Sequence, residues 1–202
     1  WSYDAGVSFS AGKEGVFTIS GSATWFDSYI HDWIIWLPTT KGFFSPKNIK
    51  DVHAYGVEID GKLDWIFARE WKLDIGATFS WTPSINNGEP VSIADQSVGK
   101  QLPYVPEYSS SINGRIAWRG WAFTYKWCYY SERYTMSSND ISLTGKLPTY
   151  FMSNIVLEKN LNFKWADLSL KGAVNNLFNE EYLSVLSRPM PGINFEIFIG
   201  IT

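Results

Sequence analysis

Hydrophobic and polar residues alternate along most of the chain. In the last segment Phe195, Ile197 and Ile199 fall on one side of an extended chain, and Asn194 and Glu196 fall on the other. A period of two residues is typical of a β-strand with one apolar and one polar face. No segment places apolar residues at helical spacing over three turns. The alternation predicts about nine strands, at residues 2–10, 16–36, 52–68, 71–81, 106–118, 121–133, 148–158, 165–175 and 194–202.

The connections between these segments alternate strictly between short and long. Short turns are predicted near 11–15, 69–70, 119–120 and 160–162, and long loops at 37–50, 82–105, 134–147 and 176–191. In an up-and-down sheet every second connection lies at the same end, so the short turns share one rim and the long loops share the other. This is the layout of an outer-membrane barrel, and a Greek-key sandwich has no reason to sort its loops in this way. The pattern predicts an all-β fold, an antiparallel up-and-down transmembrane β-barrel.

The chain has 11 tryptophans in 202 residues, and six of them flank the predicted turns and loops. Amphipathic aromatic rings concentrate at the two interfaces of a bilayer. The alternative is that tryptophan serves as a core residue of a soluble sandwich. The tryptophans beside short turns are Trp71, Trp118, Trp121 and Trp165, and those beside long loops are Trp36 and Trp81.

Charge and motifs exclude several classes of function. The net charge of −3 argues against a nucleic-acid partner, and no run approaches the roughly 20 apolar residues of a membrane helix. The lone Cys128 predicts an inert thiol, and His31 and His53 are predicted rim residues. The chain has no CxxC, HExxH, GxSxG or phosphate loop, so no catalytic residue, cofactor or metal site is predicted. The inward charged residues predict a hydrated lumen wall: Glu58, Asp60, Lys62, Asp64, Arg115, Lys126, Glu158 and Lys171.

The C-terminal region resembles the closing signature of TonB-dependent outer-membrane receptors. The residues that carry the resemblance are 174–179 (VNNLFN), 181–182 (EY) and 188–192 (RPMPG). Weaker support comes from 56–58 (GVE) and 102–106 (LPYVP). The resemblance implies location in the outer membrane of a Gram-negative bacterium and TonB-energised uptake of a large, scarce ligand.

The resemblance also implies how the chain relates to a whole receptor. Residues 1–202 would be the C-terminal part of a barrel of 22 strands, from the fourteenth strand to the last. The plug domain and the segment that contacts TonB would lie upstream. The family's usual terminal aromatic residue is replaced here by Thr202. Outer-membrane lipid, TonB through the missing N-terminal part, and a surface lipoprotein are the partners that the resemblance implies.

Two segments, 33–38 (WIIWLP) and 44–48 (FSPKN), resemble cobalamin receptors more than siderophore receptors. Calcium, where that subgroup uses it, binds in loops of earlier strands. A siderophore or haem receptor of the same family, a passive porin, and a soluble β-sandwich that binds carbohydrate remain alternatives.

A ligand is expected at the rim that carries the long loops. Aromatic surface combined with hydrogen-bonding groups suits a large amphipathic ligand, although each such residue could also merely solvate its loop. The candidate ligand-binding residues are Lys41, Phe43, Phe44, Asn86, Asn87, Tyr134, Asn139 and Arg188.

Overall fold

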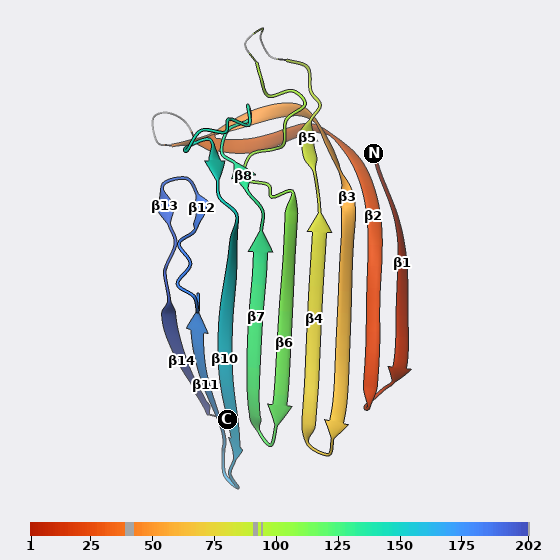
Figure 1. Ribbon diagram of the computed structural model, residues 1–202, viewed down its shortest axis with the longest axis vertical. Coiled ribbons are helices and arrows are strands. Elements are labelled where there is room, and N and C mark those ends of the chain that lie inside the picture. Colours follow the sequence, from red (N-terminus) through yellow and green to blue (C-terminus); the bar gives the residue numbers. More distant parts are fainter. Residues whose placement is uncertain (39–42, 91–92, 94, 202) are drawn as a thin grey trace.

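Nine long antiparallel strands form one curved sheet in the computed structural model, which describes residues 1–38, 43–90, 93 and 95–201 (Figure 1). Neighbours in the sheet are neighbours in the chain, in the order β1-β2-β3-β4-β6-β7-β10-β11-β14. The predicted all-β, up-and-down fold is confirmed, although the sheet is not closed into a barrel. No helix among the described residues is long and apolar enough to cross a membrane. The long strands are β1 (Ser2–Lys13), β2 (Phe17–Pro38), β3 (Phe44–Ala68), β4 (Trp71–Trp81), β6 (Tyr108–Trp118), β7 (Trp121–Tyr130), β10 (Tyr150–Asn162), β11 (Asp167–Asn175) and β14 (Asn194–Ile201).

The connections are sorted by length, as the sequence predicts. The turns after β1, β3, β6 and β10 lie at one end of the sheet, and the long connections lie at the other (Figure 1). The long connections contain short strands that the alternation did not predict. These are β5 (Ser84–Asn86), which pairs with β3, and the pairs β8 (Arg133–Tyr134) with β9 (Lys146–Leu147) and β12 (Leu183–Val185) with β13 (Arg188–Pro189).

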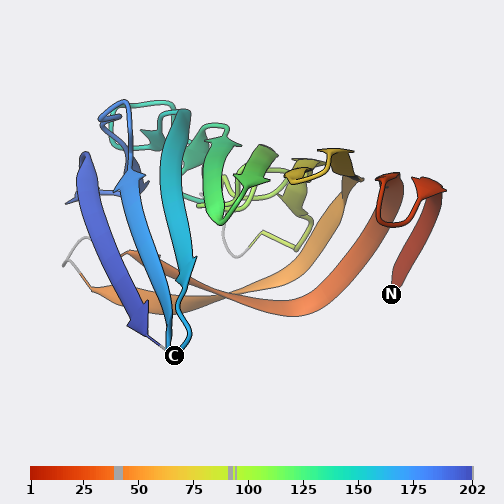
Figure 2. The same cartoon turned by 90° about the horizontal axis from the view of Figure 1, so that it is seen from below.

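The predicted loop at 37–50 is wrong. β2 continues to Pro38 and β3 begins at Phe44, and the two strands stay in register from Phe17 opposite Trp65 to Pro38 opposite Phe44. Proline is tolerated there because the outer half of the hairpin is a two-stranded ribbon, whose outer edges have no ladder hydrogen bonds to lose. Viewed along the strands, the sheet is an open arc, and this long hairpin crosses from the β1 side towards β11 and β14 (Figure 2).

The predicted turn at 160–162 is also wrong. β10 runs on to Asn162, and the chain turns at 163–166, where the Phe163 N–H donates to the Ala166 carbonyl at 2.9 Å. The ladder continues because the side chains of Asn162 and Asp167 lie opposite each other and form a hydrogen bond of 3.0 Å. Asn160 and Asn162, which the sequence predicts as turn residues, therefore belong to the paired strands.

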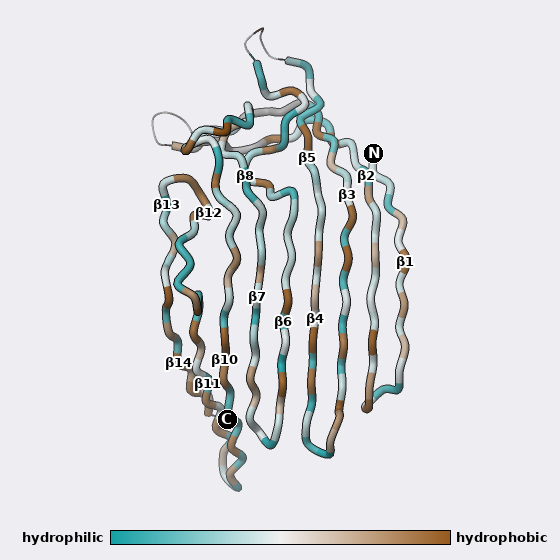
Figure 3. Tube along the Cα trace, in the orientation of Figure 1, coloured by the Kyte–Doolittle hydropathy of each residue, from teal (hydrophilic) through white to brown (hydrophobic). Residues whose placement is uncertain are grey.

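The strand register assembles one continuous apolar face. A single row across the middle strands contains Trp65, Leu73, Ile116, Phe123 and Leu157, each directly opposite the next. Hydrophobic and hydrophilic residues succeed one another along strands such as β3, β4 and β6 (Figure 3). Side chains on this face stay exposed because nothing in the described part of the chain packs over them. Examples on the last strand are Phe195, Ile197 and Ile199, which are 71%, 81% and 67% exposed.

The opposite face is polar and carries the charged residues that the sequence assigns to it. Ion pairs join neighbouring positions of this face, some within a strand and some between strands. It also holds small buried residues such as Ala122, Thr124 and Ala173. Side chains converge on the concave side of a curved sheet, which is why this face is the more crowded one. The pairs are Lys62–Asp64 at 2.9 Å, Lys72–Asp74 at 3.1 Å and Arg115–Glu158 at 2.8 Å.

Aromatic rings form a belt near each end of the apolar face. At the short-turn end Trp71 stacks on Trp118, with ring centroids 5.3 Å apart. At the other end the rings of Tyr29 and His53 stack, with centroids 4.0 Å apart, and Trp81 lies edge to face with Tyr55. The 11 residues of β4 run from Trp71 to Trp81. Ten steps of about 3.3 Å, tilted by about 40°, give a height of about 25 Å, which is the apolar band of an outer-membrane barrel.

The turn between β6 and β7 depends on two residues in the left-handed region. Arg119 has a φ of 45° and Gly120 a φ of 76°, as a two-residue type I′ turn requires. A Cβ on Gly120 would lie 2.6 Å from the carbonyl oxygen of Asn160 on β10. Only glycine therefore lets this turn pack against the neighbouring strand.

A charge on the apolar face should destabilise the fold far more than the same charge on the polar face. Ile112 lies on the apolar face midway along β6, between the two belts. Ile112→Arg should cost about 2–4 kcal/mol, the price of a cation at the bilayer midplane. The control Ser111→Arg places the cation on the polar face, beside a pocket of about 410 Å³, and should change little. Urea unfolding of the full-length protein in lipid vesicles measures the loss for each variant. Equal losses would contradict the assignment of the faces.

Gly120→Ala should destabilise the β6–β7 hairpin. The methyl group meets a backbone oxygen that cannot move freely, and the left-handed backbone alone costs an ordinary residue about 1–2 kcal/mol. Gly114→Ala is the matched control, since nothing lies within 4 Å of its Cβ position. The same unfolding assay should show a loss for Gly120→Ala and none for Gly114→Ala. A harmless Gly120→Ala would contradict the type I′ geometry.

Candidate ligand-binding rim

The two loops that follow β4 and β7 are joined by a reciprocal pair of hydrogen bonds. The Asn139 side-chain amide donates to the Gln101 carbonyl at 2.8 Å, and the Gln101 N–H donates to Asn139 Oδ1 at 2.8 Å. The Gln101 side chain then accepts the Ser84 N–H at 2.9 Å. Asn139 adopts a φ of 54°, a conformation that asparagine tolerates better than most residues. Residues 38 positions apart thus form one rigid part of the rim.

A small core lies under these loops. Val52 of β3 and Leu102 are 1% and 3% exposed, and Ile30 and Val105 pack around them. Through Leu102 and Val105, segment 102–106 therefore packs its loop against β2 and β3. Its Tyr104 N–H donates to the Tyr134 carbonyl at 2.7 Å, which adds a second link between the loops.

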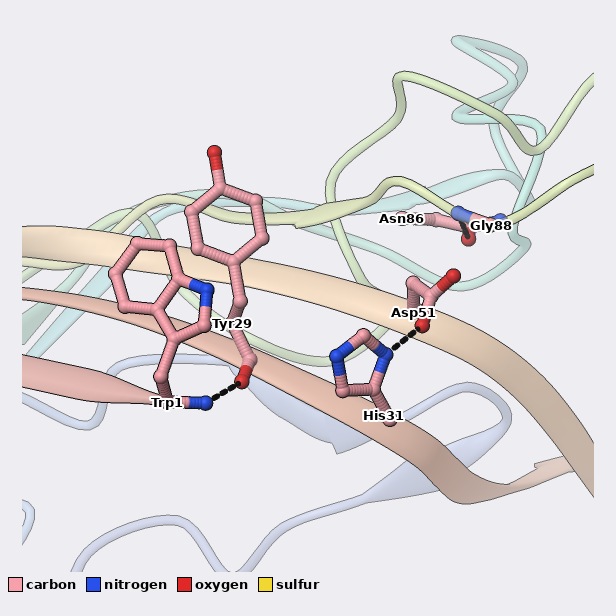
Figure 4. Close-up of polar contacts among 6 residues, drawn as sticks. All are labelled: Trp1, Tyr29, His31, Asp51, Asn86 and Gly88. Carbon is pink, nitrogen blue, oxygen red and sulfur yellow. Dashed lines mark hydrogen bonds and ion pairs between the residues drawn. The ribbon is translucent and has the colours of Figure 1, made fainter.

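Asn86, at the end of β5, is a loop anchor. It is 6% exposed; its amide donates to Ser97 Oγ at 2.9 Å, and its Oδ1 accepts the Gly88 N–H at 3.0 Å (Figure 4). The adjacent Asn87 is exposed, and its N–H donates to the Asp51 carbonyl at 2.8 Å. Asn87 therefore presents its side chain at the surface, while Asn86 uses both ends of its amide within the loop.

Arg133 connects the loop after β7 to the loop after β11. It is 5% exposed, and its guanidinium donates to the Leu183 carbonyl at 3.1 Å and lies 4.9 Å from the ring centre of Tyr150. Burial lowers the pKa of this guanidinium. Tyr150 in turn stacks on Tyr182 at 4.7 Å, and burial raises the pKa of Tyr182. A buried cation and tyrosine rings thus fasten the last long loop to the sheet.

Asn176 organises the loop between β11 and β14. It is 2% exposed, with a φ of 50°. Its amide donates to the carbonyls of Glu180 at 2.9 Å and Pro191 at 3.3 Å, and its Oδ1 accepts the Glu180 N–H at 2.8 Å. Asn179 adds a further closure, because its Oδ1 accepts the Ile193 N–H at 2.9 Å. The motif at 174–179 is therefore a loop-closing device.

A pocket of about 610 Å³ opens beside this loop. Its lining includes the carboxylates Glu180 and Glu181, the ring of Tyr182 and the thioether of Met190. Such a surface can accept hydrogen bonds and contact an apolar group. No nucleophile paired with a general base is found among the described residues of this lining.

The eight predicted ligand-binding residues divide into three groups. Lys41 lies outside the described residues, and Phe44 is described only as the first residue of β3. Phe43, Asn87 and Arg188 are exposed at the long-loop end. The remaining three, Asn86, Tyr134 and Asn139, are buried or half-buried in the loop contacts described above.

The structure brings Tyr134 and Asn139 together with the loop that carries Asn86, whereas Arg188 lies in the separate β12–β13 hairpin. That these eight residues bind a ligand stays a prediction. Sequence reasoning missed Gln101 and Arg133 as links between loops. Both are ordinary polar residues beside loops, and no periodic pattern marks them.

Both histidines lie in cross-strand pairs with aspartates. His31 pairs with Asp51 (Figure 4), and His53 Nε2 lies 2.8 Å from Asp27 Oδ1. The N-terminal amine of Trp1 donates to the Tyr29 carbonyl nearby at 3.0 Å. Within the described ranges, no three histidine, cysteine or acidic residues gather as a metal site would require.

Comparison with known proteins decides the family. Residues 1–177 match the family described as "TonB dependent receptor-like, beta-barrel". The chain belongs to the TonB-dependent receptor family. No curated protein matches it. The match covers the strands from β1 to β11, and it ends within the motif at 174–179.

Solved structures of this family share the fold at low sequence identity. The siderophore receptor PiuA from Acinetobacter baumannii has a TM-score of 0.67 and 16% identity over 98% of this chain and 28% of its own. The ferric citrate transporter FecA in its unliganded form has a TM-score of 0.65 and 14% identity, over 90% of this chain and 26% of its own. The copper transporter OprC has a TM-score of 0.63 and 14% identity, over 96% of this chain and 30% of its own. This chain therefore spans less than a third of the length of these structures.

Membership of the TonB-dependent receptors places the chain in the Gram-negative outer membrane. The apolar face with its two aromatic belts then faces lipid, and the polar face lines the lumen. The short turns lie on the periplasmic side and the long loops outside. The alternatives of a passive porin and of a soluble sandwich are not supported. The family match does not fit a porin, and a single sheet with nine long strands in chain order does not fit a sandwich.

Asn176→Ala should loosen the last extracellular loop. The change leaves the carbonyls of Glu180 and Pro191 and the Glu180 N–H without their partner, and a group left unsatisfied costs up to about 1–3 kcal/mol where water cannot reach it. We expect faster proteolysis within 176–193 and a lower midpoint of urea unfolding. The exposed Asn160 supplies the control, Asn160→Ala, which should change neither. Unchanged proteolysis in Asn176→Ala would show that the amide does not close the loop.

Proposed function

We propose that this chain is the C-terminal part of the barrel of a receptor for energised uptake of a large, scarce ligand. The observation that carries the proposal is the separation of the two ends: four short turns on one side, and long, mutually anchored loops on the other. Loops fixed by buried amides can hold exposed contact residues in place. Family membership supports the transport role.

Energy would reach this barrel through segments outside the chain. In this proposal TonB acts on the N-terminal part of the receptor, and a plug domain meets the lumen wall. The wall suits that contact because it is polar and several of its charges are paired with each other, for example Arg115 with Glu158.

Two classes of ligand fit the proposal. Segments 33–38 and 44–48 resemble those of cobalamin receptors and favour cobalamin, with a surface lipoprotein as an additional partner. The solved structures of similar fold are named for siderophores, ferric citrate and copper, which favours a ferric siderophore equally. Both ligands are large and bear apolar and hydrogen-bonding groups, as does the rim.

Ligand titration of the full receptor tests the proposal. Cyanocobalamin, ferric siderophores and haem should be titrated separately, and one class should bind while the others do not. Substituting the exposed rim residues Phe43, Asn87 and Arg188 by alanine together should weaken that ligand about 10-fold or more, or about 1.4 kcal/mol.

Lys164→Ala, at a periplasmic turn, is the control and should bind as the unsubstituted receptor does. Absence of binding to every ligand, or binding unchanged in the triple variant, would overturn the assignment of the rim.

A further inference from the structure

Three tryptophans lie side by side at the periplasmic end of the lipid-facing side. Trp71 stacks on Trp118 at 5.3 Å, and Trp118 lies directly opposite Trp121 across the β6–β7 turn. Trp118 and Trp121 are 36% and 44% exposed. Indole rings on this face lie at the level of the lipid head groups.

A lysine interrupts the apolar face at the same level. Lys159 of β10 lies opposite Trp121 and shares its face with Leu157 and Leu161. Its Nζ lies 4.7 Å from the centre of the Trp121 ring and donates to the Arg119 carbonyl at 3.1 Å. Within the part of the chain that the structure describes, this ammonium meets no carboxylate. A long side chain lying along apolar surface delivers its charge to the membrane interface.

Arg119 supplies a second cation at the same place. Its guanidinium lies 5.3 Å from the centre of the Trp118 ring and pairs with Glu70 of the neighbouring turn. The pair is largely exposed, so Glu70 neutralises Arg119 only in part. Two cations and one carboxylate leave a local excess of positive charge. The tight Arg119-Gly120 turn, packed on Asn160, fixes both cations beside the tryptophans.

We propose that Lys159, Arg119 and Trp121 form a binding site for the phosphate of a phospholipid in the periplasmic leaflet. Lys159 Nζ and the Arg119 guanidinium donate to the phosphodiester oxygens, and Trp121 contacts the glycerol region. The acyl chains then lie along Leu157 and its apolar neighbours. A phospholipid fits better than a protein partner, because the cations sit at the head-group level with exposed apolar side chains beside them.

Native mass spectrometry of the full receptor in detergent tests this site. Phosphatidylglycerol should be retained, and Lys159→Gln should weaken its retention about 5- to 10-fold, while Lys159→Arg keeps most of it. Lys62→Gln is the matched control: it removes the same charge from the lumen face and should retain lipid normally. Because Lys159→Gln could disturb the strand, Arg119→Gln provides an independent variant on the turn and should also weaken retention.

Three results would overturn the proposal. The first is unchanged retention in both Lys159→Gln and Arg119→Gln. The second is equal retention of diacylglycerol, which has no phosphate. The third is competition by soluble glycerol phosphate at the concentration of the lipid, which would show a general anion site without a role for the acyl chains.

Discussion

The backbone hydrogen bonds between neighbouring strands are the constraint on which the rest of the structure depends. In a bilayer no water can satisfy an N–H or carbonyl, so each strand must pair along its whole length with the next. The register that results extends from Phe17 opposite Trp65 to Leu168 opposite Ile201, with a shift in the β3–β4 pair between Ile66 and Ala68. Because side chains alternate, that same register fixes which residues meet lipid and which meet the lumen. A slip of one residue in any strand would exchange the two, and the apolar rows would end at that strand.

Once the strands are paired, the two ends of the sheet are free to serve different purposes. At the periplasmic end the chain needs only to reverse, and two residues such as Arg119 and Gly120 suffice. At the outer end the loops must hold a shape without a sheet to support them. They do so with side-chain amides placed where backbone groups would otherwise lack partners, as Asn86, Asn139 and Asn176 show. These asparagines use their hydrogen-bonding capacity within the loops, whereas a neighbour such as Asn87 is exposed at the surface.

The sequence alone was sufficient for the existence of the nine long strands and for their two faces, because both follow from a local period of two. The sorting of loops follows from the lengths of the segments between those strands. The sequence did not predict where some strands end. Asn162 is polar and still extends a strand pair, and Pro46 lies within β3 at an edge that has no further described strand beside it. The rim was the least predictable part. Asn86 and Arg188 look equivalent in a list of polar loop residues, yet one is buried and the other exposed. The difference arises from contacts between residues far apart in the chain, such as Gln101 with Asn139, which no local pattern records.

The two outermost strands show why this sheet depends on the rest of a receptor. β1 pairs only with β2, and β14 only with β11, in the described structure. Each therefore carries a row of backbone groups without ladder partners, and every residue of β1 is exposed. In lipid such an edge costs several kcal/mol for each unpaired group, and in water it would pair with another chain. The apolar face and the open edges therefore have the same requirement. Further strands must pair with β1 and β14 and close the barrel, so that the backbone groups at both edges are satisfied in lipid.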